Sequence, residues 1–546
     1  MGVLNDYILI LVLLWIAVMV FCIKEIQATQ QSGGYDKKIV IIQILLFLGV
    51  IIRSVYLTYP YGNFPDESIA GYDAWCIANY GVDQHLASYP VYLQSWGSGQ
   101  SAVYAYLAVP FVKLFGLSIE VLRLPMVIVS SISLLFFYYA LRKTQQDKSL
   151  IFAIILVFVI SPWHIMKSRW ALDCNLCPEF VLIGVGFILL AIHAIGSRKQ
   201  LAYYVVAFAF FILGAYSYGA GWFMLPLFCL ILLIYLLRRK YITWQISAIV
   251  VFISLILAIP LLLFAYQLIS GDEQYSIGSI TITQLATGRH ESTTFLTADD
   301  PLSVFWSFIK KGMKLLITGN DKLQWNSIPF WGQFYNLLGL PFIIYTFFYF
   351  AKSKKLCILD SIFLIWLIAT LPMMIMIDPN VNHWNLLWFP LLYFMARGIA
   401  LIAGKRMIYS VFIYTFFFCL FIGFCFKYFT YYNTYEWRGF VRGQEEPVKF
   451  AYTLDVDSIY YPDFFIQAHI LFYHPINPYI YSVTRDMSDP REAQVGRFGK
   501  NRFYAPKEIN IQSRTAYIIP NRLLGSFNSE GVHVQRYSIY SVVWKE

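Results

Sequence analysis

The sequence predicts an all-α polytopic membrane protein with about 12 transmembrane helices, in-plane helices in the first outer loop and a small C-terminal α+β extracytoplasmic domain. Of the 546 residues, 59% are hydrophobic and 13% are charged, which is too apolar for a water-soluble globular protein. Apolar runs long enough to cross about 30 Å of hydrocarbon recur along the chain. Basic residues gather in every second break between these runs.

Twelve apolar runs are predicted to span the membrane. They cover residues 7–23, 39–57, 122–141, 149–162, 176–195, 201–215, 221–237, 244–266, 333–351, 356–377, 384–403 and 407–426. Solid apolar runs favour helices, because a β-barrel would show alternating strands of about ten residues. The runs 149–162 and 201–215 are short for a full crossing, so tilted or partly re-entrant segments stay open there. The first run has no basic leader or small-residue cleavage site and is predicted to be a retained anchor.

Orientation follows from the basic breaks, which we expect to face the cytoplasm. Their residues are Lys24, Lys37, Lys38, Arg142, Lys143, Lys148, Arg198, Lys199, Arg238, Arg239, Lys240, Lys352, Lys354, Lys355, Lys405 and Arg406. The predicted domains are residues 1–426, which hold the spans and the outer loops 58–121 and 267–332, and residues 427–546. The net charge of +10 reflects this topology, and no basic patch indicates a nucleic-acid partner.

Three of the eight cysteines, Cys76, Cys174 and Cys177, are predicted to face outward. A disulfide or a reactive thiol stays open for them. A structural metal is disfavoured, because no second CxxC and no nearby histidine pair accompanies Cys174 and Cys177.

The stretch NFPDESIAGYDAW, residues 63–75, places two adjacent carboxylates just beyond a span. In one interpretation Asp66 caps a helix and Glu67 adds charge at its positive end. In the other, one carboxylate is a general base or a metal ligand at the membrane surface. Adjacent helical residues point about 100° apart, which predicts different roles for the two. Asp73 returns to the helical face of Asp66.

Two further outward segments carry polar groups. SPWHIMKSRWALDCN, residues 161–175, holds His164, Lys167, Arg169 and Asp173. Its cations bind an anionic headgroup, or else reach lipid headgroups while Trp163 and Trp170 anchor the segment at the interface. DPNVNHWNLLWFP, residues 378–390, holds Asn382, His383 and Asn385. These side chains suit sugar hydroxyls or phosphate oxygens, or else Asn382 caps a helix and Trp384 and Trp388 act as anchors.

The order of the motifs resembles that of membrane glycosyltransferases of the GT-C fold. The motifs are PDE, GYDAW, YGVD, YPVYLQSWGSGQSAVYAYLAVP, FGLSIEVLRLP, SPWH, SRWALDCN, YSYGAGWF and HWNLLWFPLLY, within roughly residues 45–400. The sequence is most similar to bacterial relatives of protein O-mannosyltransferases and of lipid A aminoarabinose transferases. The resemblance implies a multi-pass enzyme of the bacterial plasma membrane, with its active site on the extracytoplasmic side. Such an enzyme moves a sugar from a polyprenyl-phosphate donor to a hydroxyl of a lipid, glycan or protein, with inversion.

Carried over residue by residue, the resemblance makes Asp66 the candidate base, supported by Glu67, and Asp173 the second acidic position. The candidate donor-phosphate and substrate-binding residues are Arg53, Tyr72, Asp73, His164, Lys167, Arg169, Asn175, Asn382, His383 and Asn385. Two positions depart from the family pattern: Asp173 lies in LDCN where LExN is expected, and His383 takes the place of an arginine. No cofactor is certain, and a divalent cation at Asp66, Glu67 or Asp173 stays open.

Two other classes of function compete with the transferase. A transporter or flippase of lipid-linked sugars would place ionisable residues near mid-membrane on broken helices, whereas these spans are nearly free of charge. A non-catalytic envelope assembly protein would leave the clustering of acidic and cationic groups in distant loops without a reason. The residues therefore favour chemistry at the outer surface.

Overall fold

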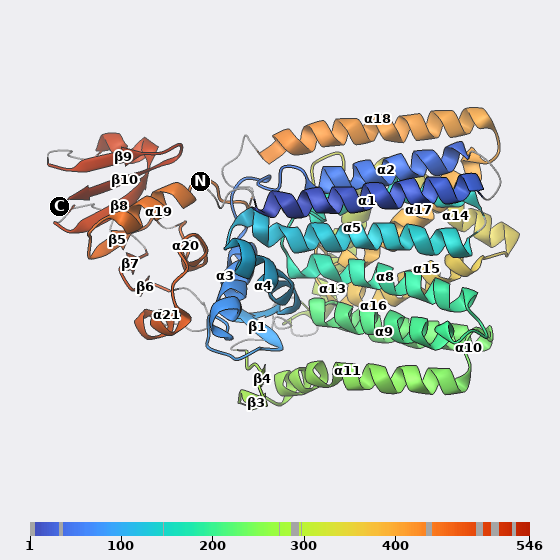
Figure 1. Ribbon diagram of the computed structural model, residues 1–546, viewed down its shortest axis with the longest axis horizontal. Helices are drawn as coiled ribbons and strands as arrows, with labels where there is room; N and C mark the ends of the chain where they lie inside the picture. Colours follow the sequence, from blue (N-terminus) through green and yellow to red (C-terminus); the bar gives the residue numbers. More distant parts are fainter. Residues whose placement is uncertain are drawn as a thin grey trace. The chain divides into compact units, whose positions relative to one another are not determined.

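The structure is a computed structural model, and most of its chain is helical (Figure 1). It describes residues 6–31, 36–145, 147–271, 273–285, 294–295, 298–432, 439–462, 464–486, 495–503, 511, 513–526 and 531–545. The chain divides into two compact units. The bundle unit comprises Met1–Tyr56, Arg123–Leu262 and His290–Tyr431, and the loop–tail unit comprises Leu57–Leu122, Leu263–Arg289 and Tyr432–Glu546.

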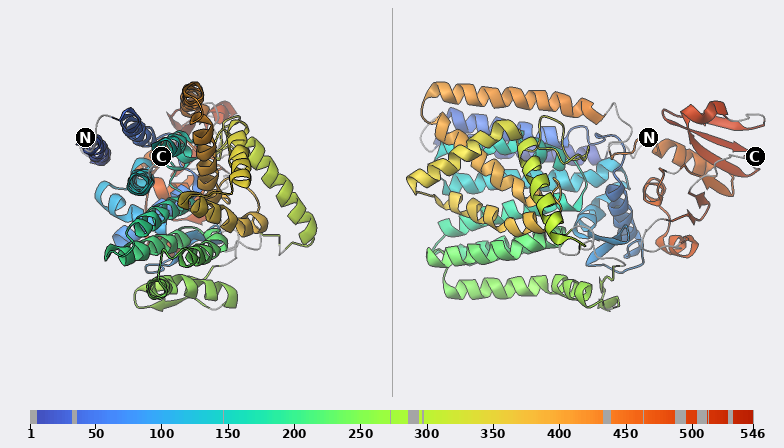
Figure 2. Two further views of the ribbon diagram at one scale, coloured as in Figure 1. Left: turned by 90° about the vertical axis from the view of Figure 1, so that its right-hand side faces the viewer. Right: turned by 180° about the vertical axis from the view of Figure 1, so that it is seen from behind.

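The bundle unit consists of helices, many of which run side by side (Figures 1 and 2). They are α1 (Asp6–Gln31), α2 (Lys37–Ser54), α5 (Ile119–Thr144), α6 (Lys148–Ile160), α7 (Pro162–Lys167), α8 (Asp173–His193), α9 (Lys199–Ser217), α10 (Gly221–Arg238), α11 (Trp244–Ser270), α13 (Pro301–Thr318), α14 (Asn336–Ser353), α15 (Ile358–Ala369), α16 (Leu371–Met376), η1 (Asn385–Leu387), α17 (Trp388–Ala403) and α18 (Met407–Tyr431). Helix α8 packs against α9, and α17 packs against α6 and α14.

Helical structure covers each of the twelve predicted spans. Within the described residues, nine segments are long and apolar enough to cross a membrane: α1, α5, α8, α9, α10, α11, α15 with α16, η1 with α17, and α18. The ranges assigned to α2, α6 and α14 stay predictions as spans. The short predicted run 201–215 extends to a 19-residue helix, α9, whereas α6 has only 13 residues.

The predicted span 356–377 is two helices. Helix α15 ends at Ala369, where the N–H of Thr370 still bonds to the carbonyl oxygens of Trp366 and Leu367 at 3.2 Å each. Helix α16 starts at Leu371 with Pro372 in its first turn. Proline has no N–H to continue the ladder of α15, so the break follows from the sequence Thr-Leu-Pro.

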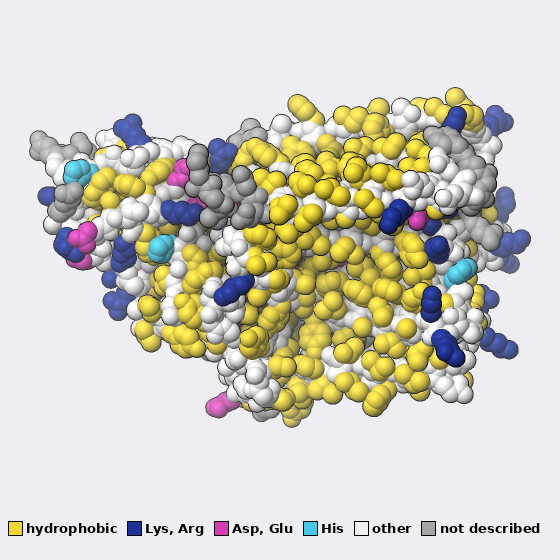
Figure 3. Space-filling model, in the orientation of Figure 1, with side chains coloured by type: hydrophobic (Ala, Val, Ile, Leu, Met, Phe, Trp, Pro, Cys, Tyr) yellow, Lys and Arg dark blue, Asp and Glu magenta, His cyan; other side chains and the backbone are white. Residues whose placement is uncertain are grey.

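Side chains facing the surroundings of the bundle are largely apolar, and Lys and Arg gather at the end where α5, α8 and α10 terminate (Figure 3). Peripheral helices expose large aliphatic and aromatic residues, for example Leu9 of α1, Phe252 of α11 and Phe426 of α18. A surface of this kind suits contact with lipid and not with water.

The loop–tail unit combines short helices and three sheets. Its helices are α3 (Pro65–Tyr80), α4 (Val103–Phe115), α19 (Glu445–Thr453), α20 (Gln467–Tyr473), α21 (Pro478–Thr484) and η3 (Asn521–Ser526). Its strands are β1 (Tyr92–Ser95), β2 (Ser98–Ser101), β3 (Tyr275–Ile277), β4 (Ile280–Ile282), β5 (Ser458–Tyr460), β6 (Arg497–Phe498), β7 (Asn501–Arg502), β8 (Thr515–Pro520), β9 (His533–Arg536) and β10 (Tyr540–Lys545). Helix α4 contains Pro110, and the in-plane placement predicted for helices of this loop stays a prediction.

The tail folds around a six-stranded mixed sheet in the order β6-β7-β5-β8-β10-β9. Strand β5 runs parallel to β7 and β8, and the other pairs are antiparallel. Tyr517 and Ile519 of β8 and Val543 of β10 form a hydrophobic cluster. Alternation and turn residues in the tail sequence predicted this α+β character.

The first outer loop packs on the tail, so the two form one compact unit, whereas the predicted domains grouped that loop with the spans. Helix α3 lies against α20, and the hydroxyl of Tyr72 donates to the carbonyl oxygen of Ile476 at 2.8 Å. Asn63 and Val441 exchange two backbone hydrogen bonds, at 3.3 and 3.0 Å. These contacts between residues hundreds of positions apart do not show in a local sequence pattern.

Replacing Gly62 by alanine should destabilise the loop–tail unit strongly. Gly62 has a φ of +88°, and a Cβ there would collide with the backbone carbonyl of Val441. We expect a loss of at least about 3 kcal/mol, because backbone cannot yield as a side chain can. The control is Gly81→Ala, also at positive φ but with ordinary contacts, which should lose about 1–2 kcal/mol. Equal shifts in the thermal unfolding midpoints of the two variants would contradict the collision.

Candidate functional site

Glu67 and Asp66 have different partners in the first turn of α3. Pro65 takes the first helical position, and the Glu67 Oε2 atom accepts from the backbone N–H of Phe64 at 3.1 Å. The fully buried Glu67 therefore satisfies the start of the helix, and the interpretation of Asp66 as the cap is wrong. The half-buried Asp66 instead accepts from the indole N–H of Trp96 at 3.0 Å through Oδ1.

Tyr72 and Asp73 lie deeper in the loop–tail unit, and both side chains are buried. Asp73 accepts two hydrogen bonds from Gln84, at 2.9 Å from the backbone N–H and at 3.1 Å from the side-chain amide. Burial and the charge of Asp83 raise the pKa of Asp73 well above its usual range. Together with the bond from Tyr72 to Ile476, this geometry shows both residues bracing the unit.

Asp83 forms a second buried carboxyl group beside Asp73. Its Oδ1 atom accepts from the backbone N–H groups of His85 and Ala87, at 2.8 Å each, while burial raises its pKa to about 6. His85 Nδ1 lies 3.2 Å from a guanidinium nitrogen of Arg485, and burial with this neighbour lowers the pKa of His85 to about 3. The imidazole is therefore neutral and accepts from Arg485.

The Lys167 ammonium is the most distinctive cation of the bundle unit. It is 2% exposed and donates to Asn326 Oδ1 at 3.0 Å and to Asn382 Oδ1. It also lies 4.2 Å from the ring centre of Trp170. No carboxylate forms an ion pair with Lys167 in the described part of the chain, and burial lowers the pKa of its ammonium to about 8. A buried cation held by neutral groups leaves charge available to an anion.

The supporting amides are held in place by Asp321. Its Oδ2 atom accepts from Asn326 Nδ2 at 2.7 Å and from the backbone N–H of Val381 at 2.9 Å. Asn380 Oδ1 accepts from the backbone N–H groups of Asn382 and His383, so Asn380 makes this turn and the interpretation of Asn382 as a helix cap is wrong. Asp321 and Asn326 lie in the range 267–332, which was predicted to be an outer loop, and no sequence motif singled them out.

Arg169 closes the end of α2. It is fully buried, and its guanidinium donates at 2.7 Å to the carbonyl oxygens of Ile52, Val55 and Tyr56. These oxygens follow the last turn of the helix, where a cation is favourable. These hydrogen bonds hold Arg169 at the end of α2, and its predicted contact with donor phosphate stays a prediction.

Arg53, His164 and Glu179 form a buried chain of polar contacts. Arg53 donates to the carbonyl oxygens of Gly49, Phe158 and Val159 and lies 2.8 Å from His164 Nδ1. His164 Nε2 is 2.7 Å from Glu179 Oε1. Because an arginine can only donate hydrogen bonds, Nδ1 of His164 is the acceptor. The proton of the ring is therefore on Nε2, which donates a hydrogen bond to Glu179.

The same chain continues to Ser133 on α5, whose hydroxyl donates to the second oxygen of Glu179. Arg53, His164 and Glu179 are each at most 1% exposed, so a neutral imidazole bridges a buried guanidinium and a buried carboxylate. Arg53 and His164 were predicted to bind donor or substrate; the structure shows their contacts with each other and with Glu179, and the binding role stays a prediction. The sequence-based prediction missed Glu179, although a lone carboxylate in the predicted span 176–195 was a signal for it. The spans are therefore less free of charge than the sequence analysis described them.

The remaining predicted residues fix the segment between α7 and α8. Asn175 donates to the carbonyl oxygens of Lys167 and Trp170, at 3.2 and 3.0 Å. Asn385 accepts from the indole of Trp163 at 3.0 Å and donates to the carbonyl oxygen of Cys174. Asp173 Oδ1 accepts from the backbone N–H of Cys174 at 2.7 Å in the first turn of α8.

His383 is half-buried, and its Nδ1 donates to the carbonyl oxygen of Asp378 at 2.7 Å, which sets the orientation of the ring.

Several interfacial predictions are wrong. The side chains expected as aromatic anchors are buried at 3% exposure or less: Trp163, Trp170, Trp384 and Trp388. Cys76, Cys174 and Cys177 are buried free thiols, so they do not form the disulfide that was left open for them, and their outward side stays a prediction. These tryptophan and cysteine side chains are buried because their segments pack inside the protein.

No group of three or more His, Cys, Asp or Glu side chains within the described ranges is arranged to hold a metal ion. Of the residues proposed for a cation, Glu67 and Asp173 each give an oxygen to a backbone N–H, and Asp66 gives one to Trp96.

A double-mutant cycle should reveal the coupling of Arg53 to Glu179. Glu179→Leu leaves a buried guanidinium without its carboxylate and should cost about 3–5 kcal/mol. Arg53→Met should be similarly costly, whereas the double variant should lose at least about 1 kcal/mol less than the sum of the two. Unfolding of the purified protein measures all three variants. Simple additivity would contradict the coupling through His164.

The Asp83 carboxyl should contribute less stability to the loop–tail unit as the pH rises from about 4 through 6. The folded state raises the pKa of Asp83 to about 6, so it binds a proton that the unfolded chain releases near pH 4. The folded state therefore loses on the order of 2 kcal/mol over this window. His85, whose pKa burial lowers to about 3, has the opposite effect in this range, so the wild type is compared with Asp83→Asn at each pH. The unfolding midpoint of the wild type relative to that of Asp83→Asn should fall between pH 5 and pH 7.5. The exposed Asp457→Asn is the control, and a dependence that Asp83→Asn leaves unchanged would exclude this carboxyl.

Comparison with known proteins gives a structural likeness and no sequence match. No protein-family model matches the sequence, and neither does any curated protein. The structure is similar to apo ArnT from Cupriavidus metallidurans, with a TM-score of 0.50 and 12% identity over 92% of this chain and 97% of that chain. The complex of that ArnT with undecaprenyl phosphate gives a TM-score of 0.46 at 13% identity, with the same two coverages.

The oligosaccharyltransferase AglB from Archaeoglobus fulgidus, in complex with an inhibitory peptide and a dolichol-phosphate, gives a TM-score of 0.44 at 15% identity over 76% of this chain and 57% of that chain. The likeness to apo ArnT extends over nearly the whole length of both proteins. The GT-C fold implied by the order of the sequence motifs is therefore confirmed: this chain is folded like ArnT.

Proposed function

We propose that this protein is a membrane glycosyltransferase that moves a sugar from a polyprenyl-phosphate donor to a hydroxyl group on the extracytoplasmic face of the membrane. The observation that carries the proposal is the Lys167 ammonium, which is buried and held by neutral amides. The ArnT fold supports it, because the solved ArnT structures include one bound to undecaprenyl phosphate.

Lys167 is assigned to the phosphate of the donor. Asn326 and Asn382 accept from its ammonium and hold it in place without neutralising it. As the bond between the anomeric carbon and the phosphate oxygen breaks, both bonding electrons go to that oxygen, and a buried cation stabilises the growing charge. A long apolar prenyl chain suits a protein whose helices expose aliphatic side chains.

Asp66 is assigned to the acceptor. The acceptor oxygen must lose its proton as it forms the new bond to the anomeric carbon, and a carboxylate takes that proton. Trp96 orients Asp66 by donating to Oδ1, while Glu67 is used for the helix start. Attack opposite the leaving phosphate inverts the anomeric centre.

Two substitutions separate donor binding from transfer. Lys167→Met should weaken binding of undecaprenyl phosphate on the order of 10- to 100-fold, because a charged hydrogen-bond donor is lost. Asp66→Asn keeps an oxygen for Trp96 and should leave that affinity unchanged, while slowing sugar transfer by roughly 10²–10⁴-fold. The exposed Lys314→Met on α13 is the matched control, with an expected change below about twofold.

Affinity is measured by native mass spectrometry of the purified protein. Transfer is measured in proteoliposomes that contain a polyprenyl-phosphate hexose with a radiolabelled sugar and an extract of envelope acceptors. Undiminished affinity in folded Lys167→Met would remove Lys167 from the donor site, and full transfer by Asp66→Asn would remove the base. Labelled donor that crosses the bilayer without transfer would favour a flippase.

A further inference from the structure

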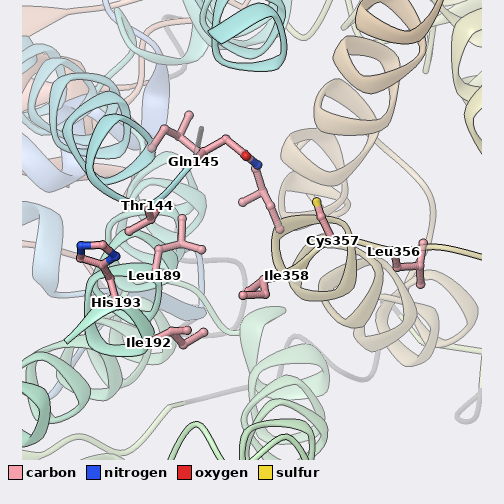
Figure 4. Close-up of a pocket in the computed structure, with 10 residues that line it drawn as sticks. Thr144, Gln145, Leu189, Ile192, His193, Leu356, Cys357 and Ile358 are labelled. Atoms are coloured by element: carbon pink, nitrogen blue, oxygen red, sulfur yellow. The ribbon is translucent and has the colours of Figure 1, made fainter. Parts of the chain in front are cut away.

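A cavity of about 510 Å³ opens in the bundle unit among three helix ends (Figure 4). Its lining residues are Leu141, Thr144 and Gln145 at the end of α5, Leu189, Ile192 and His193 at the end of α8, and Leu356, Cys357, Ile358 and Leu359 at the start of α15. Figure 4 shows His193, Ile192 and Leu189 on one side, with Ile358 and Cys357 across from them. We call this cavity the α5–α8–α15 pocket.

This pocket is separate from the Lys167 site. Asn175, near the start of α8, bonds to the carbonyl oxygen of Lys167, whereas the pocket is lined by the last turns of the same helix. Helix α8 has 21 residues, which corresponds to a length of roughly 30 Å at 1.5 Å per residue. The two sites therefore lie at opposite ends of one membrane-length helix.

The pocket has an apolar wall and a polar edge. Six of its ten lining residues are leucine or isoleucine, while Thr144, Gln145, His193 and Cys357 supply polar groups. A volume of several hundred Å³ is in the range of pockets that hold small molecules. An aliphatic wall with a polar edge suits an amphiphile better than a fully hydrated ion.

Lysines adjoin the lining residues on two sides. Lys143 precedes Thr144, and Lys354 and Lys355 precede Leu356. All three are exposed, and no carboxylate forms an ion pair with them in the described ranges. Arg142 is directed elsewhere, toward Glu25 at 3.9 Å and Thr29.

The nearest acidic group does not cancel these charges. Asp360 is fully buried and gives its oxygens to Tyr393 at 2.6 Å, Arg397 at 3.1 Å and the backbone N–H of Cys357 at 3.0 Å. Asp360 also caps the 12-residue helix α15, because it accepts from the N–H of Cys357 while Cys357 Sγ accepts from the N–H of Asp360, so the charge offered to a ligand here comes from the lysines. The exposed Asp147 and the half-buried Asp36 interact with the start of α6 and with Lys148.

We propose that the α5–α8–α15 pocket binds an anionic phospholipid. The acyl chain lies along the leucine and isoleucine wall, and the phosphate binds at the start of α15 beside Lys143, Lys354 and Lys355. Each basic residue near a membrane surface contributes on the order of 1 kcal/mol to attraction of anionic lipid. This site is independent of the proposed transfer reaction, and its failure would leave that proposal untouched.

The test uses the full-length protein in detergent and native mass spectrometry with dioleoylphosphatidylglycerol. The wild type should bind this lipid on the order of tenfold more tightly than dioleoylphosphatidylcholine. Lys354→Gln/Lys355→Gln should remove most of that preference. The matched control, Lys405→Gln/Arg406→Gln, removes two exposed cations from the loop between α17 and α18 that does not line the pocket, and should keep the preference within about twofold.

A second variant tests the cavity itself. Thr144→Trp places a large side chain in the pocket without removing charge, and it should weaken phosphatidylglycerol binding on the order of tenfold. Equal binding of the two lipids by the wild type, or an equal loss in the Lys405/Arg406 control, would overturn the proposal. Competition by sodium phosphate at the affinity of the lipid would overturn the lipid assignment and indicate a soluble anion.

Discussion

The buried contact of Arg53 with Glu179 through the neutral ring of His164 is the constraint on which the bundle unit depends. It joins α2, α7 and α8 and, through Ser133, also α5. His164 and Lys167 belong to the same six-residue helix, α7, so the ring that bridges the two charges also fixes the base of the Lys167 side chain. Charges that cannot reach water are tolerated here only because each has a close partner.

The buried cations of the bundle unit differ in the groups that accept their hydrogen bonds. Lys167 donates to the side-chain oxygens of Asn326 and Asn382, whereas Arg53 donates to backbone carbonyl oxygens and reaches a carboxylate through His164. Arg169 is as buried as Lys167, but its guanidinium donates to backbone carbonyl oxygens at the end of α2. Burial alone therefore says little about function, and the identity of the acceptors decides which cation can meet a ligand.

Much of the architecture could be predicted from the sequence, because apolar run length and basic breaks report directly on membrane helices. The different partners of Asp66 and Glu67 also agree with the 100° between adjacent helical positions. Residue roles could not be predicted where they depend on distant partners. The sequence does not show that Arg53 donates to a carbonyl oxygen of α6. It also does not show that Asn326 accepts a hydrogen bond from Lys167.

The long sequence separation of the contacts around α8 has a consequence for biosynthesis. Asn385 bonds to Trp163 and to Cys174, which precede it by 222 and 211 residues. At about 5–20 residues per second, the ribosome needs roughly 10–40 seconds to make that intervening chain. During this time α7 and α8 lack the amide that later joins them to η1. The bundle interior is thus completed late, and a chain truncated before residue 385 would present this unfinished face to lipid or to a membrane chaperone.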